Sequence, residues 1–166
     1  MKRLALLLVI SMVLSGCYNA YRNNIYYKSA FNYIKELPDI KTNCLSVSDT
    51  LINLELCNFY EEISEIRNLK EKDILFILDS IDNVMSLVKY HYPLLSKFNN
   101  SDSCTNTLFF SKLIDNMLLA EVINNRGDLS ANHYKLTAFN KSTIFIFIFD
   151  SEKRISKVFS KELQYD

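Results

Sequence analysis

Apolar residues recur at helical spacing along most of the chain and change to strict alternation near its C-terminal end. Apolar residues three and four positions apart are typical of amphipathic helices. Four segments have this spacing, at residues 18–37, 48–67, 72–92 and 105–124. The segment 72–92 has the widest apolar stripe, so we expect it to be the central helix. The chain contains only two glycines and two prolines, which leaves few tight loops and favours helices.

The alternating segment runs from Thr143 to Phe149, where isoleucines alternate with phenylalanines. β-Branched and aromatic residues in this pattern predict a central strand with apolar contacts on both faces. We expect flanking strands at residues 155–160 and 133–139. The expected fold class is therefore α+β: mostly a helical bundle of about four helices over residues 18–126, followed by a small C-terminal antiparallel β-meander over residues 133–160.

The N-terminal segment has the layout of an export signal rather than of a folded element. It begins Met1-Lys2-Arg3, continues through an apolar run to Leu14 and ends in small residues. A charged start, a short apolar middle and a small-residue end are typical of a secretory signal peptide. The apolar run is shorter than the roughly 20 residues that an ordinary membrane-spanning helix needs.

The sequence Leu14-Ser15-Gly16-Cys17 at the end of this segment resembles the lipobox of bacterial lipoproteins. The resemblance implies cleavage between Gly16 and Cys17, followed by attachment of fatty acyl chains such as palmitate to Cys17. Residues 1–16 would then be the signal peptide and residues 17–166 a single mature domain. An ordinary secretory signal with an unmodified Cys17 is the alternative.

The charge balance bears on the partners that the mature chain is expected to have. The whole chain has 19 basic and 19 acidic residues, and Lys2 and Arg3 would leave with the signal peptide. A slightly acidic domain argues against a nucleic-acid partner, which would require a basic surface. We therefore expect membrane attachment through the acyl chains on Cys17, because two or more chains anchor stably. An aspartate directly after the lipidated cysteine would resemble an inner-membrane retention signal, but this chain has Tyr18 there. The position of Tyr18 therefore favours the outer membrane, with the domain facing the periplasm.

The other three cysteines are Cys44, Cys57 and Cys104, and an exported protein meets an oxidising compartment in which disulfides form. In an up-and-down bundle, Cys44 and Cys104 would lie at the same end, whereas Cys57 would lie well inside its helix. A disulfide requires Cα atoms within about 7 Å. We therefore predict a Cys44–Cys104 disulfide; the alternative is three unpaired cysteines packed as small apolar residues.

No catalytic motif is found in the chain. It lacks a nucleophile elbow, a zinc-protease motif and a glycine-rich phosphate loop. Its two histidines, His91 and His133, are expected at a helix end and at the start of a strand. Acidic pairs such as Glu61/Glu62 and Asp79/Asp82 are expected on solvated helix faces. We therefore predict no catalytic residues, no metal site and no cofactor.

These expectations favour a non-catalytic, membrane-anchored accessory lipoprotein of the cell envelope that binds another protein. In outline it is similar to pilotins, which are short helical lipoproteins with a disulfide, and an assembly factor is a related hypothesis. No pilotin motif is present, and the expected β-meander departs from the pilotin outline. The alternative is an immunity or exclusion lipoprotein, in which an acidic patch would meet a basic toxin; an enzyme acting on the cell wall or on lipid is a third. The acidic patch consists of Glu55, Glu61, Glu62 and Glu65.

Overall fold

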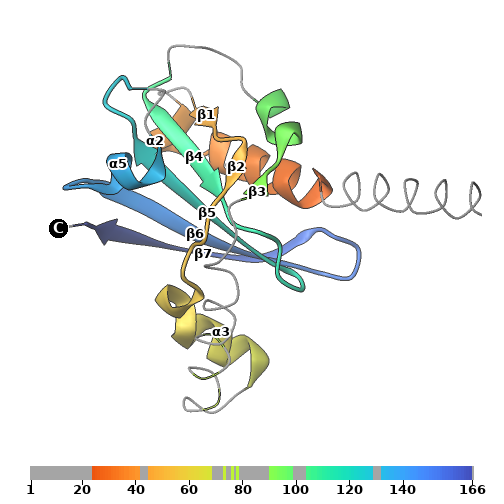
Figure 1. The fold of residues 1–166 in the computed structure, drawn as a ribbon. Coiled ribbons are helices and arrows are strands. Elements are labelled where there is room, and N and C mark those ends of the chain that lie inside the picture. The colour runs from red at the N-terminus through yellow and green to blue at the C-terminus, as the bar shows by residue number, and fades with distance from the viewer. Residues whose placement is uncertain are drawn as a thin grey trace, which may run out of the picture.

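A computed structural model describes residues 24–41, 45–68, 90–98, 104–128 and 132–165, with Asp73, Phe76 and Leu78 as single described positions. Its centre is a five-stranded mixed sheet with the strand order β1-β4-β5-β6-β7 (Figure 1). The strands are β1 (Leu45–Val47), β4 (Asn106–Phe110), β5 (Met117–Asn124), β6 (Lys141–Phe149) and β7 (Ile155–Gln164). Strand β1 runs parallel to β4, and all the other neighbours are antiparallel.

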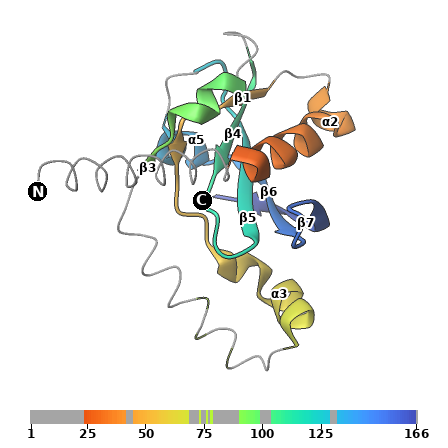
Figure 2. The ribbon, with the colours of Figure 1, turned by 90° about the vertical axis from the view of Figure 1, so that its right-hand side faces the viewer.

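Short helices and a second small sheet surround the main sheet. An N-terminal helix over residues 24–35 crosses one face of the sheet, as Figure 2 shows from the side. The other described helices are α2 (Pro38–Lys41), η1 (Leu56–Phe59), α3 (Tyr60–Arg67), η2 (Pro93–Phe98) and α5 (His133–Thr137). Strands β2 (Thr50–Leu51) and β3 (Tyr90–His91) form a two-stranded antiparallel sheet. Among the described residues, no helix is long and apolar enough to cross a membrane.

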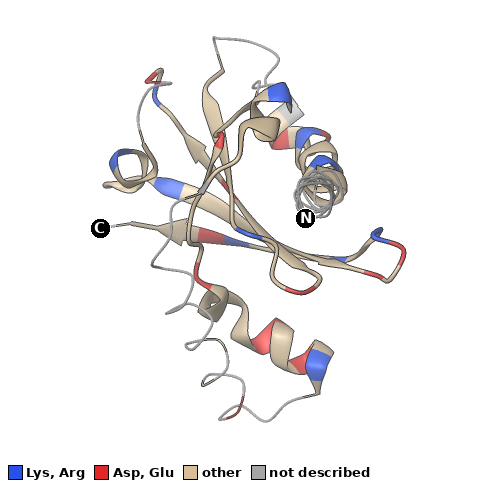
Figure 3. Ribbon diagram, turned by 45° about the vertical axis from the view of Figure 1, so that its right-hand side comes forward, with Lys and Arg blue, Asp and Glu red and all other residues tan. Residues whose placement is uncertain are grey.

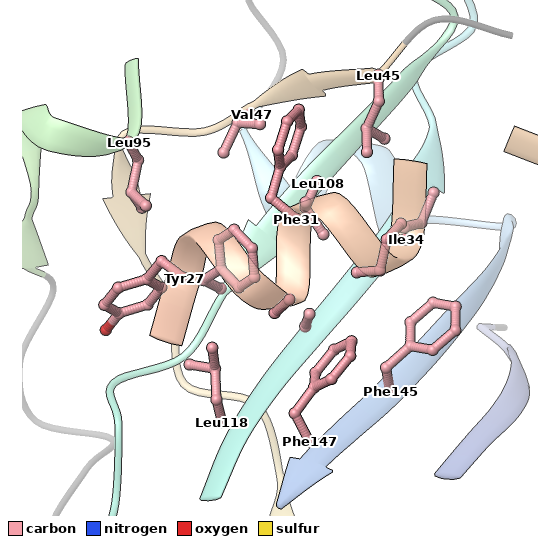
Figure 4. Close-up of a cluster of buried hydrophobic side chains, with 14 of the residues drawn as sticks. Tyr27, Phe31, Ile34, Leu45, Val47, Leu95, Leu108, Leu118, Phe145 and Phe147 are labelled. Carbon is pink, nitrogen blue, oxygen red and sulfur yellow. The ribbon is translucent and has the colours of Figure 1, made fainter. Parts of the chain in front are cut away.

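Few charged side chains lie in the middle of the main sheet. In Figure 3 the coloured residues lie mostly on helices, on loops and toward the ends of strands, whereas the centre of the sheet is mostly tan. Alternate residues of β6 supply this apolar interior on both faces. Phe145 and Phe147 pack beneath the N-terminal helix against Phe31 and Ile34 (Figure 4). Ile144 and Ile146, which alternate with these phenylalanines along β6, face the opposite side.

That opposite face of the sheet is covered by the segment that contains η1 and α3. Phe59 and Ile63 from this segment are fully buried against Ile144, Ile146 and Leu119. The ammonium group of Lys161 holds the segment on β7, since its Nζ lies 2.9 Å from a carboxylate oxygen of Glu62. Burial on both faces explains why the prediction of a central strand at Thr143–Phe149 is confirmed within β6.

The expected fold class, a bundle of about four helices followed by a small β-meander, is wrong because the fold is dominated by the sheet. The predicted helix at 105–124 is the antiparallel pair β4–β5, and the predicted strand at 133–139 contains the helix α5. The physical reason is burial on both faces: β5 is apolar at nearly every position, and such a run matches helical spacing as well as strand spacing. The region assigned to the bundle, 18–126, therefore contains three strands of the main sheet.

The predicted helix at 18–37 is confirmed over residues 24–35, and its first residues lie outside the described part. The predicted start of a helix near residue 48 is wrong, because β1 and β2 occupy this region and the helix begins only at α3. The predicted central helix at 72–92 falls largely outside the described residues, and at its end Tyr90–His91 is a strand. The predicted strand at 155–160 is confirmed as the first part of β7.

The cysteines are described only in part. Cys104 is buried and its sulfur is in a disulfide, whereas the sulfur of Cys57 is a thiol. Cys44, the predicted partner, lies outside the described residues, so the Cys44–Cys104 pairing stays a prediction. The reason for expecting it changes, because the described residues are built around a sheet instead of a bundle. The parallel β1–β4 ladder pairs Leu45, the residue after Cys44, with Asn106.

Candidate binding pocket beside a buried glutamate

Glu121 is the one acidic or basic side chain that is fully buried among the described residues. It lies in the middle of β5, where its cross-strand neighbours are Phe109 on β4 and Ile144 on β6. Its face of the sheet also carries Leu119 and Ile123, which are buried. An isolated carboxylate in such an apolar environment is strongly destabilising unless it is paired and hydrogen-bonded. The burial of Glu121 therefore requires polar partners for its carboxylate.

Both carboxylate oxygens of Glu121 have a polar partner. The Nε2 atom of His133 lies 2.7 Å from Oε2, and the hydroxyl of Tyr165 donates to Oε1 at 2.6 Å. His133 is the first residue of α5, whose N-cap Asn132 accepts a hydrogen bond from the backbone N–H of Lys135. Tyr165 directly follows β7. Two segments distant in the sequence thus converge on one carboxylate.

These contacts shift the pKa values of Glu121 and Tyr165. Burial by itself would raise the pKa of Glu121, but the polar groups of His133, Ser142 and Tyr165 and the charge of His133 outweigh burial and hold the pKa below its ordinary value. Burial raises the pKa of Tyr165, and the hydrogen bond to the Glu121 carboxylate raises it further. Glu121 is therefore ionised near neutral pH, and Tyr165 keeps the proton that it donates.

His133 and Tyr165 also form part of the wall of a pocket of about 330 Å³. The rest of the wall comes from the loop between β2 and η1, from η1 itself, from the first half of β6 and from the end of β7. Its apolar residues are Leu54, Ile144 and Leu163. Its other polar residues are Asn53, Glu55, Asn58 and Gln164. The volume is within the range of small-ligand sites, which combine apolar walls with a few convergent polar groups.

Few of the residues singled out in the sequence meet in this pocket. Cys17 and the cleavage position Gly16–Cys17 lie outside the described residues. His133 was expected at the start of a strand, but it begins α5 and reaches Glu121. His91 is exposed, and its Nδ1 lies 3.5 Å from a carboxylate oxygen of Asp49. His91 therefore has no part in the pocket.

The expected acidic patch is divided among different roles. Glu55 lines the pocket, Glu62 is paired with Lys161, and Glu61 accepts a hydrogen bond from the hydroxyl of Tyr60. Sequence reasoning missed Glu121 and Tyr165. The signal for Glu121 was present, because it is the one charged residue in the apolar run of β5. Nothing in the sequence marks Tyr165.

The chemistry of the pocket is that of hydrogen bonding. Within the described residues, no group of three histidine, cysteine, aspartate or glutamate side chains comes together to hold a metal ion. Because Glu121 is buried behind His133 and Tyr165, a ligand in the pocket would meet these two side chains and not the carboxylate itself. Glu121 is therefore a positioning residue for both.

Comparison with known proteins finds no matching family model, no significant sequence match and no solved structure that matches significantly.

Proposed function

We propose that the protein is a lipid-anchored accessory protein of the cell envelope that binds another protein and is not catalytic. The lipobox resemblance at Leu14-Ser15-Gly16-Cys17 supports the anchor. The peptide from Cys17 to Asn24 reaches at most roughly 25 Å when it is fully extended. Such a tether would keep the domain close to the bilayer and raise its effective concentration toward other envelope proteins. We propose the periplasmic face of the outer membrane as its location.

The observation that carries the binding proposal is a pair of exposed aromatic residues, Tyr134 within α5 and Phe139 just after it, called here the α5 surface. These side chains are 84% and 79% exposed, the two highest values among the large hydrophobic residues described. Exposed aromatic residues beside an arginine are typical of the residues that dominate protein–protein binding energy. Arg126 is that arginine, since its Nη2 donates to the carbonyl oxygen of Phe139 at 2.9 Å.

The α5 surface is held in place by hydrogen bonds. The backbone of Phe139 has a φ of 53°, a left-handed conformation that is rare for a bulky residue. The neighbouring Asn140 fixes the turn, because its Nδ2 donates to the carbonyl oxygens of Leu136 and Asn124, both at 3.0 Å. A surface that is ordered before binding loses less conformational entropy when a partner docks. This order supports a recognition role.

The position of the α5 surface also supports a partner other than the membrane that holds the chain. In Figures 1 and 2 the first described residues of the N-terminal helix and α5 lie on opposite sides of the sheet. A bilayer that held the chain at Cys17 would therefore lie nearer the helix than α5. The α5 surface would be accessible to a protein in the periplasm.

The arrangement around Glu121 favours binding over catalysis. A general base must come within hydrogen-bond reach of the proton that it removes. Both oxygens of Glu121 are occupied and its side chain is fully buried, so it cannot meet a substrate. We propose that it orients His133 and Tyr165 for recognition.

Photo-crosslinking in cells tests the proposal. A photoreactive phenylalanine analogue at position 134 should give one discrete crosslinked protein, and Cys17→Ser should reduce its yield. The same analogue at position 33, a 41% exposed tyrosine on the N-terminal helix, is the control and should give none. Equal crosslinking from both positions, or none from position 134, would contradict the proposal. A crosslinked toxin would support the immunity alternative instead.

A further inference from the structure

We infer that the pocket beside His133 and Tyr165 binds an alkylammonium or alkylguanidinium group, presented as a lysine or arginine side chain of the protein partner. That the group belongs to a protein rests on the function proposed above.

The side chains beside Glu121 leave hydrogen-bonding capacity for a ligand. The Nε2 atom of His133 is taken up by the Glu121 carboxylate, so Nδ1 is the ring nitrogen left to meet a ligand. Tyr165 gives its hydroxyl hydrogen to Glu121, so its oxygen has only acceptor capacity left. Gln164 donates through Nε2 to the carbonyl oxygens of Asn140 and of Tyr165, which leaves its amide oxygen as an acceptor. A ligand rich in N–H donors complements such a wall.

The charge of the pocket is negative as well. Glu55 contributes an exposed carboxylate to the wall, and ionised Glu121 lies directly behind His133 and Tyr165. No lysine or arginine is among the residues that line the pocket in the described part of the chain. Lys161, on the adjacent strand, is directed to Glu62 and to the carbonyl oxygen of Asn58. An anionic ligand would be repelled by the two carboxylates, whereas a cation would be attracted.

The shape of the pocket suits a side chain with an apolar stem and a polar end. Ile144 and Leu163 belong to the apolar face of the sheet, and Leu54 closes the pocket from the loop before η1. Lysine and arginine side chains bury their methylene groups against apolar surface while the charged end meets polar partners. The pocket borders the α5 surface through His133, which directly precedes Tyr134. One docked partner would therefore contact both.

Titration with small probes tests the chemistry. The probes are n-butylguanidinium, n-butylammonium and, as neutral and anionic controls, butyramide and butyrate. They are added to the mature protein in detergent, and the NMR signals of the Ile144 methyl groups and the His133 ring are followed. We expect saturable shifts with the two cations only. Saturable binding of butyrate, or equal binding of butyramide, would overturn the inference.

Two matched variants test whether n-butylguanidinium binds in this pocket. Glu55→Gln should weaken n-butylguanidinium binding about tenfold, because it removes one charged hydrogen-bonding partner. Glu65→Gln, which changes an exposed glutamate outside the pocket, should leave binding unchanged. Equal affinities for the two variants would overturn the assignment of the site.

Competition separates this inference from the proposed function. An excess of n-butylguanidinium should reduce the crosslink formed from position 134. If the cation binds but the crosslink is unaffected, the partner does not supply the cation and the inference about its source is wrong. If no cation binds while the crosslink stands, the pocket inference fails and the proposed function remains.

Discussion

Replacing Glu121 by glutamine removes the buried charge while keeping the size of the side chain. In the wild type this carboxylate accepts hydrogen bonds from His133 and Tyr165. A hydrogen bond to a charged group contributes about 1.5–3 kcal/mol, compared with about 1 kcal/mol for a neutral one. Glutamine keeps one acceptor oxygen and turns an N–H group toward a second donor. We therefore expect Glu121→Gln to lower the free energy of unfolding by about 2 kcal/mol.

Urea denaturation measures this loss as a lower transition midpoint with an unchanged dependence on denaturant. In a domain of this size, the same loss lowers the melting temperature by roughly 4–8 °C. The matched control is Glu162→Gln, an exposed position on β7, which should change the stability by less than about 0.5 kcal/mol. An effect of Glu121→Gln no larger than that of the control would refute the argument.

The pH dependence of stability distinguishes the loss of a buried charge from a simple packing defect, whose effect would not change with pH. The pKa of Glu121 is lower in the folded protein than its ordinary value of 4.5, so ionised Glu121 stabilises the fold. This contribution is complete above about pH 4.5 and is lost as the pH falls through the folded pKa. The stability difference between the wild type and Glu121→Gln should therefore shrink on acidification. A difference that stays constant down to pH 3 would contradict the ionised state.

Other changes have equally definite outcomes. Tyr165→Phe should destabilise the fold by about 1–3 kcal/mol, since it leaves one oxygen of Glu121 unpaired; an unchanged urea midpoint would argue against that contact. Phe147→Ala should lower the free energy of unfolding by about 3–5 kcal/mol, because this ring is fully buried beneath the N-terminal helix. A decrease of less than about 1 kcal/mol would mean that the core packs differently. Peptide mapping without reductant should recover Cys104 linked to Cys44, and recovery of any other link would exclude the predicted pair. Mass spectrometry should find acyl chains on Cys17 at the mature N-terminus, and an intact leader would remove the anchor.

The sequence pattern predicted β6 because two kinds of apolar residue alternate there. Isoleucine faces one layer and phenylalanine the other, so a period of two remains visible in a strand buried on both faces. β5 has no such mark, since Met117–Ala120 is uniformly apolar and Leu118 and Leu119 face opposite layers. A uniform apolar run is compatible with either period. Pairing with β4 and β6 decides the structure, and this pairing involves residues distant in the sequence.

The candidate site was hidden for the same reason. On a helix over 105–124 Glu121 would also fall on the apolar face, four residues after Met117, but only its place in a central strand brings it beside Phe109 and Ile144. His133 was noticed in the sequence, but its partner depends on where α5 packs on the sheet. Tyr165 joins the cluster because β7 ends beside the start of β6, where its N–H donates to the carbonyl oxygen of Asn140. Of these features, only the single charge of Glu121 in an apolar run is visible in the local sequence.

The affinity for the isolated crosslinked partner tests most directly that the protein binds another protein through the α5 surface. Tyr134→Ala is expected to weaken binding by about 30-fold, the equivalent of roughly 2 kcal/mol for a dominant interface residue. Because Tyr134 is 84% exposed, the variant should fold normally. Ile25→Ala, at an exposed apolar residue of the N-terminal helix, should bind like the wild type. Equal affinities for the wild type and both variants would contradict the account.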